Sequence, residues 1–172
     1  MNALISLYNA PFDRLNALAG TLVPTLARLV FILVLFYYFW KSAGTKIEGS
    51  IFSPSSVAIG KIFPKAAEAV FWDVSQLTFI QRIVIFLGTV AEFVLPVLIA
   101  VGLFTRLAAL GMIGFILVQT TVDVTGHGAA LGAWLDNAPQ LIDQRTLWIF
   151  LFLVLLFKGA GPLSLDRLLK LN

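Results

Sequence analysis

The chain has 172 residues, of which 59% are hydrophobic and only 12% are charged, and its net charge is +3. Soluble domains carry about 25% charged residues, and a domain of this size leaves a large fraction of its surface in water. The composition therefore excludes a water-soluble globular domain, a disordered chain and a fibrous repeat, and it indicates an integral membrane protein. The absence of cysteine excludes disulfides, thiolate metal sites and iron–sulfur clusters. The small net charge does not suggest a nucleic-acid partner.

The N-terminal segment has apolar residues at helical spacing. It predicts an interfacial amphipathic helix that is broken at Pro11. No basic leader stands before a short apolar run, so we expect no cleaved signal peptide. The apolar residues that define this helix are Leu4, Ile5, Leu7, Tyr8, Phe12, Leu15 and Leu18.

Four apolar runs then follow, and a membrane-spanning helix needs about 20 such residues. The predicted spans cover about residues 22–42, 82–104, 107–123 and 143–158. The fourth run is short, and we expect Arg145 and Lys158 to reach the interface from its two ends. The fold class predicted is all-α, an integral membrane four-helix transmembrane bundle with short interfacial helices. It forms a single domain over residues 1–172.

The loops indicate how the spans face the membrane. Four spans place both termini on one side, and the predicted outer loop 43–81 lies on the other side. Within that loop, Pro64 favours the start of a short helix that reaches Trp72 and lies at the membrane surface. Basic residues in short loops mark the cytoplasmic side, and Arg106 stands in the shortest turn. We therefore expect a multi-pass protein of the bacterial cytoplasmic (inner) membrane with both termini in the cytoplasm.

Several stretches, in order and spacing, resemble the DoxX family. The central one is Ala91–Pro96 with its glutamate, followed by Gly102–Leu110, which is similar to the family's G-L-x-T-R-x-A-A turn. Leu26–Leu29 resembles the early arginine, Ser42–Ile47 the glycine and lysine after the first helix, and Gly159–Arg167 the C-terminal tail. The resemblance implies a four-helix membrane bundle and a link to membrane redox chemistry. Some relatives are subunits of quinone-reducing sulfur oxidoreductases, and others associate with partners that handle thiols or superoxide.

Glu92 is the most informative single residue, because an ionisable group inside a membrane helix costs a few kcal/mol and usually faces a partner. Arg28 in the first span is the candidate partner, at a depth that differs by roughly 9 Å. One interpretation makes this polar pair a proton or quinone site. The other makes it a structural ion pair that fixes how two helices dock. If Arg28 instead reaches the surface, we expect Glu92 to be protonated.

A second polar group is expected at the outer ends of the third and fourth spans. It consists of Gln119, Asp123, His127 and Arg145, with Gln119 one turn from Asp123 on the same helix face. This outer polar cluster is either a mouth for a quinone headgroup, with His127 as proton donor, or a network that anchors the helix ends. A single His with scattered Asp residues gives no metal-ligand spacing, and no catalytic residue is assigned.

Two further features have simple structural interpretations. The aromatic run 36–40 is either an interfacial belt or part of a ligand pocket. Gly159, Gly161 and Pro162 are expected to end the fourth span, and Asp166 and Arg167 to cap and pair within a short tail.

The sequence favours three functions, in descending order. The first is a small accessory subunit of a membrane complex associated with electron transfer or quinones, which is not catalytic by itself. The second is a quinone-binding oxidoreductase subunit that acts with a partner protein. The third is a small transporter or lipid-handling protein. We expect no covalently bound cofactor. Quinone and bound lipids are the expected ligands, and membrane lipids and other membrane subunits are the expected partners.

Overall fold

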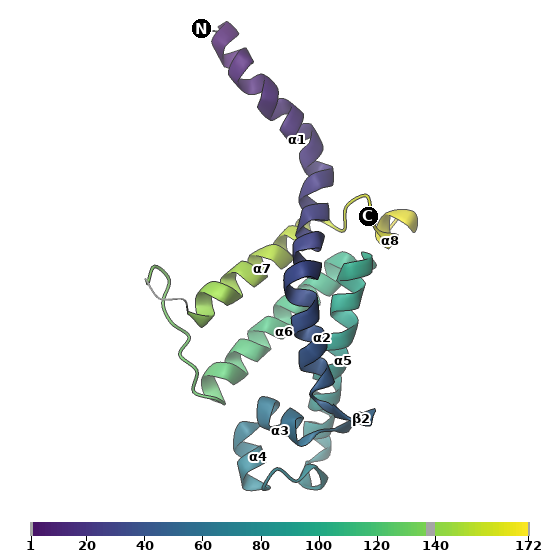
Figure 1. Cartoon of the computed structure of the whole chain (residues 1–172), viewed down its shortest axis with the longest axis vertical. Coiled ribbons are helices and arrows are strands. Elements are labelled where there is room, and N and C mark those ends of the chain that lie inside the picture. Colours follow the sequence, from purple (N-terminus) through teal and green to yellow (C-terminus); the bar gives the residue numbers. More distant parts are fainter. Residues whose placement is uncertain (1, 137–139, 172) are drawn as a thin grey trace.

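The computed structural model describes residues 2–136 and 140–171, and most of them are helical (Figure 1). Helix α1 (Asn2–Phe31) continues through a π-helical turn (Ile32–Phe36) into α2 (Tyr37–Gly44). Three long helices and one short helix follow the loop region. They are α5 (Phe79–Val101), α6 (Thr105–Thr125), α7 (Leu141–Lys158) and α8 (Leu165–Leu168). The predicted helical fold is confirmed at this level.

Three helical segments of the described residues are long and apolar enough to cross a membrane. They are Leu4–Gly44, Phe79–Val101 and Thr105–Thr125, and they contain or match the first three predicted spans. Helix α7 corresponds to the fourth predicted span but is not one of the three. Its 18 residues include three charged ones, Asp143, Arg145 and Lys158.

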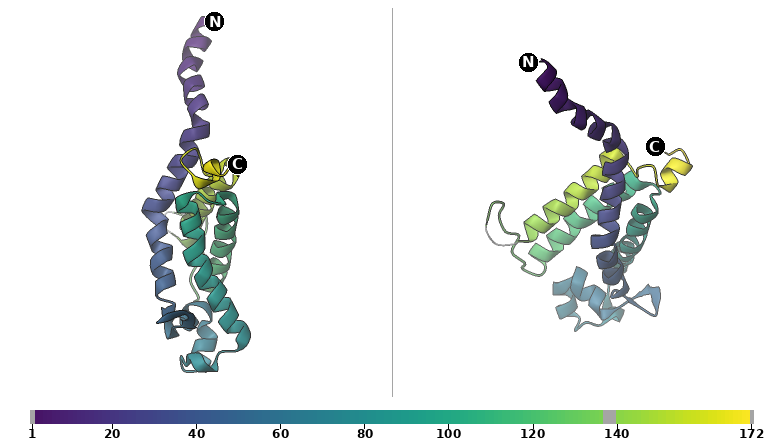
Figure 2. Two further views of the ribbon diagram at one scale, coloured as in Figure 1. Left: turned by 90° about the vertical axis from the view of Figure 1, so that its right-hand side faces the viewer. Right: turned by 45° about the horizontal axis from the view of Figure 1, so that its top comes forward.

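The long helices pack in pairs around a shared core. Helix α1 contacts α7, α7 contacts α6, α6 contacts α5, and α5 contacts α2. The core includes Phe31 and Phe152, whose rings meet edge to face with their centroids 5.7 Å apart, and the fully buried Met112 and Ile116. Figure 2 shows the same arrangement from two other directions.

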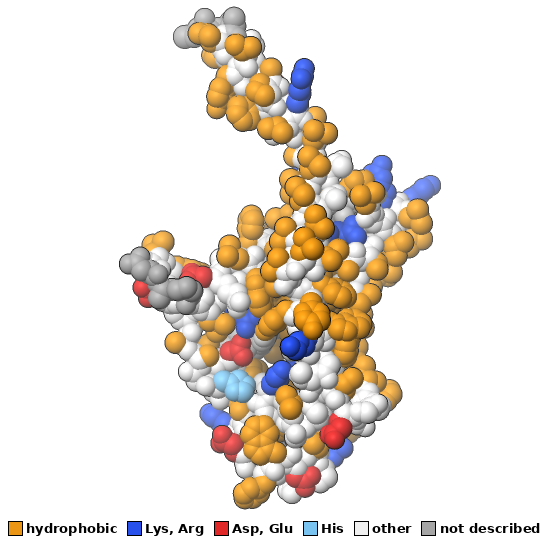
Figure 3. Space-filling view, viewed as in Figure 1, with side chains coloured by type: hydrophobic (Ala, Val, Ile, Leu, Met, Phe, Trp, Pro, Cys, Tyr) orange, Lys and Arg blue, Asp and Glu red, His pale blue; other side chains and the backbone are white. Residues whose placement is uncertain are grey.

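The outer faces of these helices are also apolar (Figure 3). Leu33 is 73% exposed, Val118 65% and Phe150 64%. Single exposed apolar residues are ordinary on soluble proteins, but broad apolar faces mark contact with a membrane or another protein. The helices are therefore apolar both toward the core and away from it.

Residues 45–78 form an ordered cap at the end of the helices opposite to the two termini (Figure 1). The cap holds an antiparallel hairpin, β1 (Ile47–Glu48) and β2 (Ser50–Pro54), which sequence analysis did not anticipate. Helix α3 (Ser56–Ile62) and helix α4 (Pro64–Ala69) follow, then a 3-10 turn at Val74–Gln76. A second core joins the cap to α5 through Ala58, Ile59, Ala67, Leu77 and Ile85.

The short helix predicted within this loop is present, and its start at Pro64 is as expected. It ends at Ala69 rather than at Trp72. The reason is a turn in the left-handed backbone region, where Phe71 has φ 50° and Trp72 has φ 63°. Such angles cannot continue a right-handed helix.

The predicted break at Pro11 is wrong, because α1 runs through both Pro11 and Pro24. A proline inside a helix removes one backbone hydrogen bond and introduces a bend, but it does not have to end the helix. The N-terminal half of α1 projects beyond the other elements (Figures 1 and 2).

Arg28 ties three parts of the chain together through backbone carbonyls. Its Nε donates to the Ile99 oxygen at 3.0 Å and its Nη2 to the Ala100 oxygen at 2.7 Å, both in the last turn of α5. Its Nη1 donates to the oxygens of Ala160 at 3.0 Å and Leu163 at 2.5 Å, in the segment that follows α7. The last carbonyls of a helix lack intrahelical donors, and a guanidinium offers five N–H groups.

Gly102 makes this arrangement sterically feasible. It follows α5 with φ 71°, and a Cβ at this position would lie 2.6 Å from the Ser164 Cβ and 2.9 Å from the Arg28 Cζ. Glycine tolerates both the left-handed backbone and the close approach. The close approach of Ser164 and Arg28 therefore explains why a glycine stands at the start of the Gly102–Leu110 stretch.

Asp166 has a different role from the one predicted. Its carboxylate accepts the backbone N–H groups of Phe104 at 2.7 Å and Thr105 at 2.9 Å, at the start of α6. The cap of α8 is Ser164, which accepts from the Arg167 N–H. Asp166 thus satisfies unpaired donors of another helix, where a carboxylate is also favoured by the helix dipole.

We predict that Arg28→Lys destabilises the protein by about 2–4 kcal/mol, because a lysine ammonium cannot reach four carbonyls in this fan and leaves buried acceptors unpaired. Thermal unfolding of the purified protein in detergent measures the effect. Arg14→Lys is the matched control, since Arg14 is exposed. Equal melting temperatures for the two variants would contradict the structural role of Arg28.

Candidate functional site

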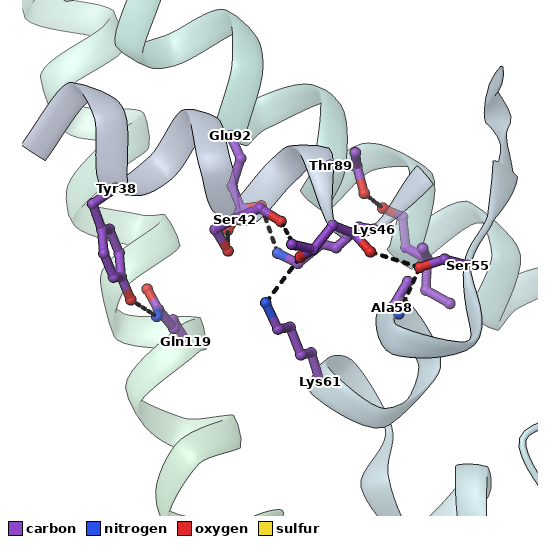
Figure 4. Close-up of polar contacts among 11 residues, drawn as sticks. Tyr38, Ser42, Lys46, Ser55, Ala58, Lys61, Thr89, Glu92 and Gln119 are labelled. Carbon is purple, nitrogen blue, oxygen red and sulfur yellow. Dashed lines mark hydrogen bonds and ion pairs between the residues drawn. The ribbon is translucent and has the colours of Figure 1, made fainter. Parts of the chain in front are cut away.

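Glu92 lies in α5 and only 2% of its surface is exposed. The Lys46 Nζ is 2.5 Å from its Oε2, and the Ser42 hydroxyl donates to its Oε1 at 3.2 Å. Lys46 is also buried, with 6% exposed. Figure 4 shows the three side chains converging from α2, the turn after it and α5. Glu92 is therefore a buried carboxylate whose oxygens are paired with the Lys46 ammonium and the Ser42 hydroxyl.

The expected Arg28–Glu92 pair is not made, and this corrects the sequence prediction. Arg28 contacts the end of α5 at Ile99 and Ala100, seven and eight residues beyond Glu92, or about 10–12 Å along the helix. The free carbonyls of the helix end hold the guanidinium there. The Arg28 side chain therefore does not reach the depth of Glu92. Lys46 instead contacts Glu92 from the opposite end of the helices.

The backbone after α2 directs Lys46 toward Glu92. The helix ends in a turn in which the Lys46 N–H donates to the Ala43 oxygen at 3.0 Å. The Lys46 oxygen then accepts the Ser55 N–H at 2.9 Å, and the Ser55 hydroxyl donates to the Thr45 oxygen at 2.7 Å. These bonds close the base of the hairpin. The cap therefore fixes the position of the cation that neutralises Glu92.

Burial lowers the pKa of the Lys46 ammonium below its ordinary value. The neighbouring Glu92 carboxylate raises this pKa through its charge and its hydrogen bond, and the charge of Lys61 lowers it. Burial has the largest effect, so Lys46 releases its proton more readily than a free lysine does. An amine of this kind beside a carboxylate is a place where a proton can be exchanged.

The Lys46–Glu92 pair forms part of the wall of a cavity of about 280 Å³ between α2, α3, α5 and α6. The wall combines charged, hydrogen-bonding and apolar groups. Its polar residues are Tyr38, Ser42, Lys46, Lys61, Glu92, Gln119, Asp123 and His127, and its other residues are Ile62, Val84, Gly88, Phe115, Val118 and Val122.

This cavity brings Glu92 of the predicted intramembrane pair together with three of the four residues of the outer polar cluster. Gln119, Asp123 and His127 of the outer polar cluster line it together with Glu92. The Gln119 Nε2 donates to the Tyr38 hydroxyl oxygen at 3.0 Å (Figure 4), and the His127 Nε2 lies 3.1 Å from the Lys61 backbone oxygen. Tyr38, from the aromatic run, thus belongs to the pocket wall.

Arg145, the fourth member of the outer polar cluster, does not line the cavity. Its Nη2 bonds the Asp123 Oδ2 at 2.8 Å, and its Cζ lies 4.7 Å from the centroid of the Trp148 ring. Arg145 is 6% exposed rather than extended to an interface, because a carboxylate and an aromatic face hold it between α6 and α7. The anchoring interpretation fits this residue.

Polar atoms without a partner remain near the cavity. In the part of the chain that the structure describes, the Gln119 Oε1 and the Nε and Nη1 of Arg145 are buried without a hydrogen bond. Buried polar groups are nearly always paired with protein, water or ligand. Gln119 lines the cavity, and its unpaired amide oxygen is enclosed by neighbouring protein atoms.

Ser42 and Lys46 were not predicted as site residues. Lys46 lies beyond the end of α2, so helical spacing does not show where its side chain points. Both residues belong to the Ser42–Ile47 stretch that resembles the DoxX family's post-helix glycine and lysine, and this resemblance was the signal that was available. Lys61 lies in the cavity wall because α3 folds against the helices, and no local sequence pattern predicts that placement.

The described residues contain no group of three or more His, Asp or Glu side chains that could hold a metal ion. Comparisons of the chain with protein-family models, curated proteins and solved structures find no match. The resemblance to the DoxX family therefore stays a prediction.

We predict that Lys46→Met and Glu92→Met each cost about 3–5 kcal/mol, because each leaves a buried charge unpaired, and that the double variant costs less than either single one. The free energy of unfolding is measured in mixed micelles for the unmodified protein, the two single variants and the double variant, which together form a double-mutant cycle. Lys61→Met, at an exposed lysine, is the control and should cost less than about 1 kcal/mol. Additive effects of the two substitutions would show that the pair is not coupled.

Proposed function

We propose that this protein is a multi-pass protein of the bacterial cytoplasmic membrane, in which α1–α2, α5, α6 and α7 form a four-helix transmembrane bundle. Three of these segments have the length and apolar composition of membrane spans. Helix α7 packs beside them and contributes Phe152 to the shared core. Its charged residues stand near its two ends, which leaves residues 147–157 apolar. The apolar outer faces support lipid as the surrounding solvent.

We further propose that the protein is an accessory subunit that binds a quinone headgroup in the cavity. The observation that carries this proposal is the buried Lys46–Glu92 pair in the wall of a cavity that is otherwise partly apolar. Small-molecule sites are concave, mainly apolar and carry a few placed polar groups, with volumes from about 300 to 1,000 Å³. A cavity of about 280 Å³ suits a single-ring headgroup better than a dinucleotide.

The wall residues match the hydrogen-bonding needs of such a headgroup. The Lys46 ammonium and the Tyr38 hydroxyl are donors for carbonyl oxygens. The Tyr38 oxygen accepts from Gln119, so its own proton is free to donate. The Glu92 carboxylate is an acceptor for a hydroxyl group. Both the oxidised and the reduced form would therefore find partners here.

A bound quinone would supply two-electron, two-proton redox chemistry. Glu92 and Lys46 share a hydrogen bond and are placed to hold or release a proton at the buried end of the cavity. Asp123 and His127 stand at the other end, where α6 finishes. Titratable side chains thus line the cavity from its buried wall to the exposed His127.

The electrons would come from a partner protein. The chain has no cysteine and a single histidine, so it lacks the residues that usually bind iron–sulfur clusters or a pair of haem-ligating histidines. The apolar outer faces of the helices are available for packing against partner helices. The accessory role therefore predicts that a redox subunit accompanies this chain in the membrane.

We predict that Gly88→Leu raises the Kd for ubiquinone-1 at least tenfold, a change of about 1.4 kcal/mol. Gly88 lines the cavity, and a Cβ there meets nothing within 4 Å, so the side chain would fill the site without disturbing the fold. Binding to protein in lipid nanodiscs gives the measurement.

Gly114→Leu is the matched control, because Gly114 also has no atom within 4 Å of a Cβ but does not line the cavity. Its Kd should equal that of the unmodified chain. If Gly88→Leu binds ubiquinone-1 as tightly as the control, the cavity is not a quinone site. A phospholipid that stays in the purified cavity and is lost in Gly88→Leu would instead favour lipid handling.

We predict that Glu92→Gln lowers ubiquinone-1 reduction in native membranes by roughly a hundredfold or more, because the amide keeps a hydrogen bond but cannot carry the proton. Glu48→Gln, at an exposed glutamate of β1, is the matched control. The level of inserted protein is measured for both.

Purification in mild detergent completes this test. A redox subunit should accompany the unmodified chain and both variants. A chain that always purifies alone would contradict the accessory role, and an unchanged reduction rate in Glu92→Gln would remove Glu92 from the proposed site.

A further inference from the structure

The N-terminal part of α1 lies outside the packed helices. Every residue from Leu4 to Leu18 is exposed, and the first buried residue of the helix is Pro24. In all views this segment extends past the other elements without a neighbour (Figures 1, 2 and 3). The apolar helix Leu4–Gly44 has 41 residues, which corresponds to about 60 Å, or twice the thickness of the hydrocarbon core of a bilayer. Half of it must therefore lie elsewhere.

The free segment is amphipathic. At about 100° per residue, its large apolar side chains fall within roughly 160° of the helix circumference. Asp13 lies opposite the middle of this arc. Asn9 and Asn16 lie roughly 40° and 20° beyond one edge, and Arg14 lies roughly 20° beyond the other edge. The residues within the arc are strongly exposed, with values of 74% for Leu4 and Leu7, 69% for Tyr8, 47% for Phe12, 57% for Leu15 and 52% for Leu18.

The same end of the molecule is positively charged. Its exposed basic residues are Arg14 in α1, Arg106 at the start of α6, Lys158 at the end of α7, and Arg167 and Lys170 in and after α8. Among the described residues there, Asp13 is the one exposed acid, because Asp166 is buried as the cap of α6.

Helix α8 adds a second apolar surface at this end. Leu168 is 78% exposed and Leu169 is 56% exposed, beside the basic Arg167 and Lys170. Figure 1 places α8 and the free part of α1 at the same end of the packed helices. Two separate elements thus combine exposed leucines with arginine or lysine.

The backbone can bend where the free segment begins. Pro24 has no N–H, so the carbonyl of Gly20 lacks its usual partner four residues on. Gly20 itself meets no atom within 4 Å of a Cβ position. The Thr25 hydroxyl donates to the Thr21 oxygen at 2.7 Å, a bond that often bends helices. The helix therefore has a built-in bending point between its free and its packed part.

We propose that residues 2–20 of α1 bind an anionic phospholipid surface, with their apolar arc at the acyl boundary and Arg14 at the phosphates. The basic residues of α8 and the helix ends contact the same surface. This inference depends on the membrane location proposed above but not on the quinone site. Amphipathic helices with basic residues bind anionic membranes in this way.

Charge argues for lipid rather than for a second copy of the chain. A second copy that approached this end would bring its own arginines and lysines against those of the first, and like charges repel. Anionic headgroups neutralise all of them at once. Each basic residue near such a surface strengthens binding roughly fivefold.

The experiment uses the full chain, whose lack of cysteine allows single labels. Leu7→Cys lies at one edge of the apolar arc, and Asn9→Cys lies outside the arc, roughly 160° from Leu7 around the helix. Each variant carries an NBD fluorophore and is reconstituted into vesicles of phosphatidylcholine with phosphatidylglycerol. Lipids brominated on their acyl chains quench a probe in the bilayer, and iodide quenches a probe in water.

We expect the label at position 7 to be quenched by brominated lipid and shifted to the blue, and the label at position 9 to be quenched by iodide. Equal iodide quenching at both positions would overturn the proposal. Protection of position 7 from both quenchers would show a protein contact, and would also overturn it.

Anionic lipid is tested separately. The blue shift at position 7 should decrease in vesicles of phosphatidylcholine alone, and Arg14→Gln should weaken the dependence on phosphatidylglycerol roughly fivefold. Lys65→Gln, an exposed lysine at the opposite end, should leave it unchanged. An equal blue shift at position 7 in vesicles with and without phosphatidylglycerol would overturn the proposal that the surface is anionic. Binding of ubiquinone-1 to the same samples shows independently whether the cavity is intact.

Discussion

The buried carboxylate of Glu92 is the constraint on which the rest of this structure depends. A charged side chain among apolar helices is costly unless a partner compensates it. The compensation comes from Lys46 and Ser42, which lie at the junction between α2 and the cap. The hairpin of the cap must form for Lys46 to be held in place, so the polar requirement of one residue in α5 determines how residues 45–55 fold.

The same pair explains why a cavity persists at this position. Apolar side chains could close the space between α2, α5 and α6, but the carboxylate, ammonium, hydroxyl and amide groups in its wall need polar surroundings. Gln119 retains an unpaired oxygen, and Gly88 leaves room where a larger residue would fill the space. Tight packing is the rule in protein interiors. A polar cavity beside a buried ion pair is consequently the strongest sign of a ligand site in the described residues.

The helical fold was predicted well from the sequence, because long apolar runs with few charges are typical of helices that could cross a membrane. Glu92, Gln119, Asp123 and His127 were predicted as polar site residues from residue type and position alone, and all four line one cavity. The partner of Glu92 was not, because depth along a helix does not show which cation reaches it. Lys46 lies beyond the end of α2, and only the turn and hairpin direct it inward. Arg145 and Asp166 were placed near the correct helix ends, but their partners lie on other elements.

Arg28 and Lys46, two of the three buried cations among the described residues, show how an arginine and a lysine serve different purposes. Arg28 meets four carbonyl oxygens from two segments, and only a planar guanidinium has enough donors in suitable directions. Lys46 meets one carboxylate, and burial lowers the pKa of its ammonium below the ordinary value. Arg28 is therefore suited to fixing two helix ends in place, and Lys46 is suited to neutralising the buried carboxylate in the wall of the cavity.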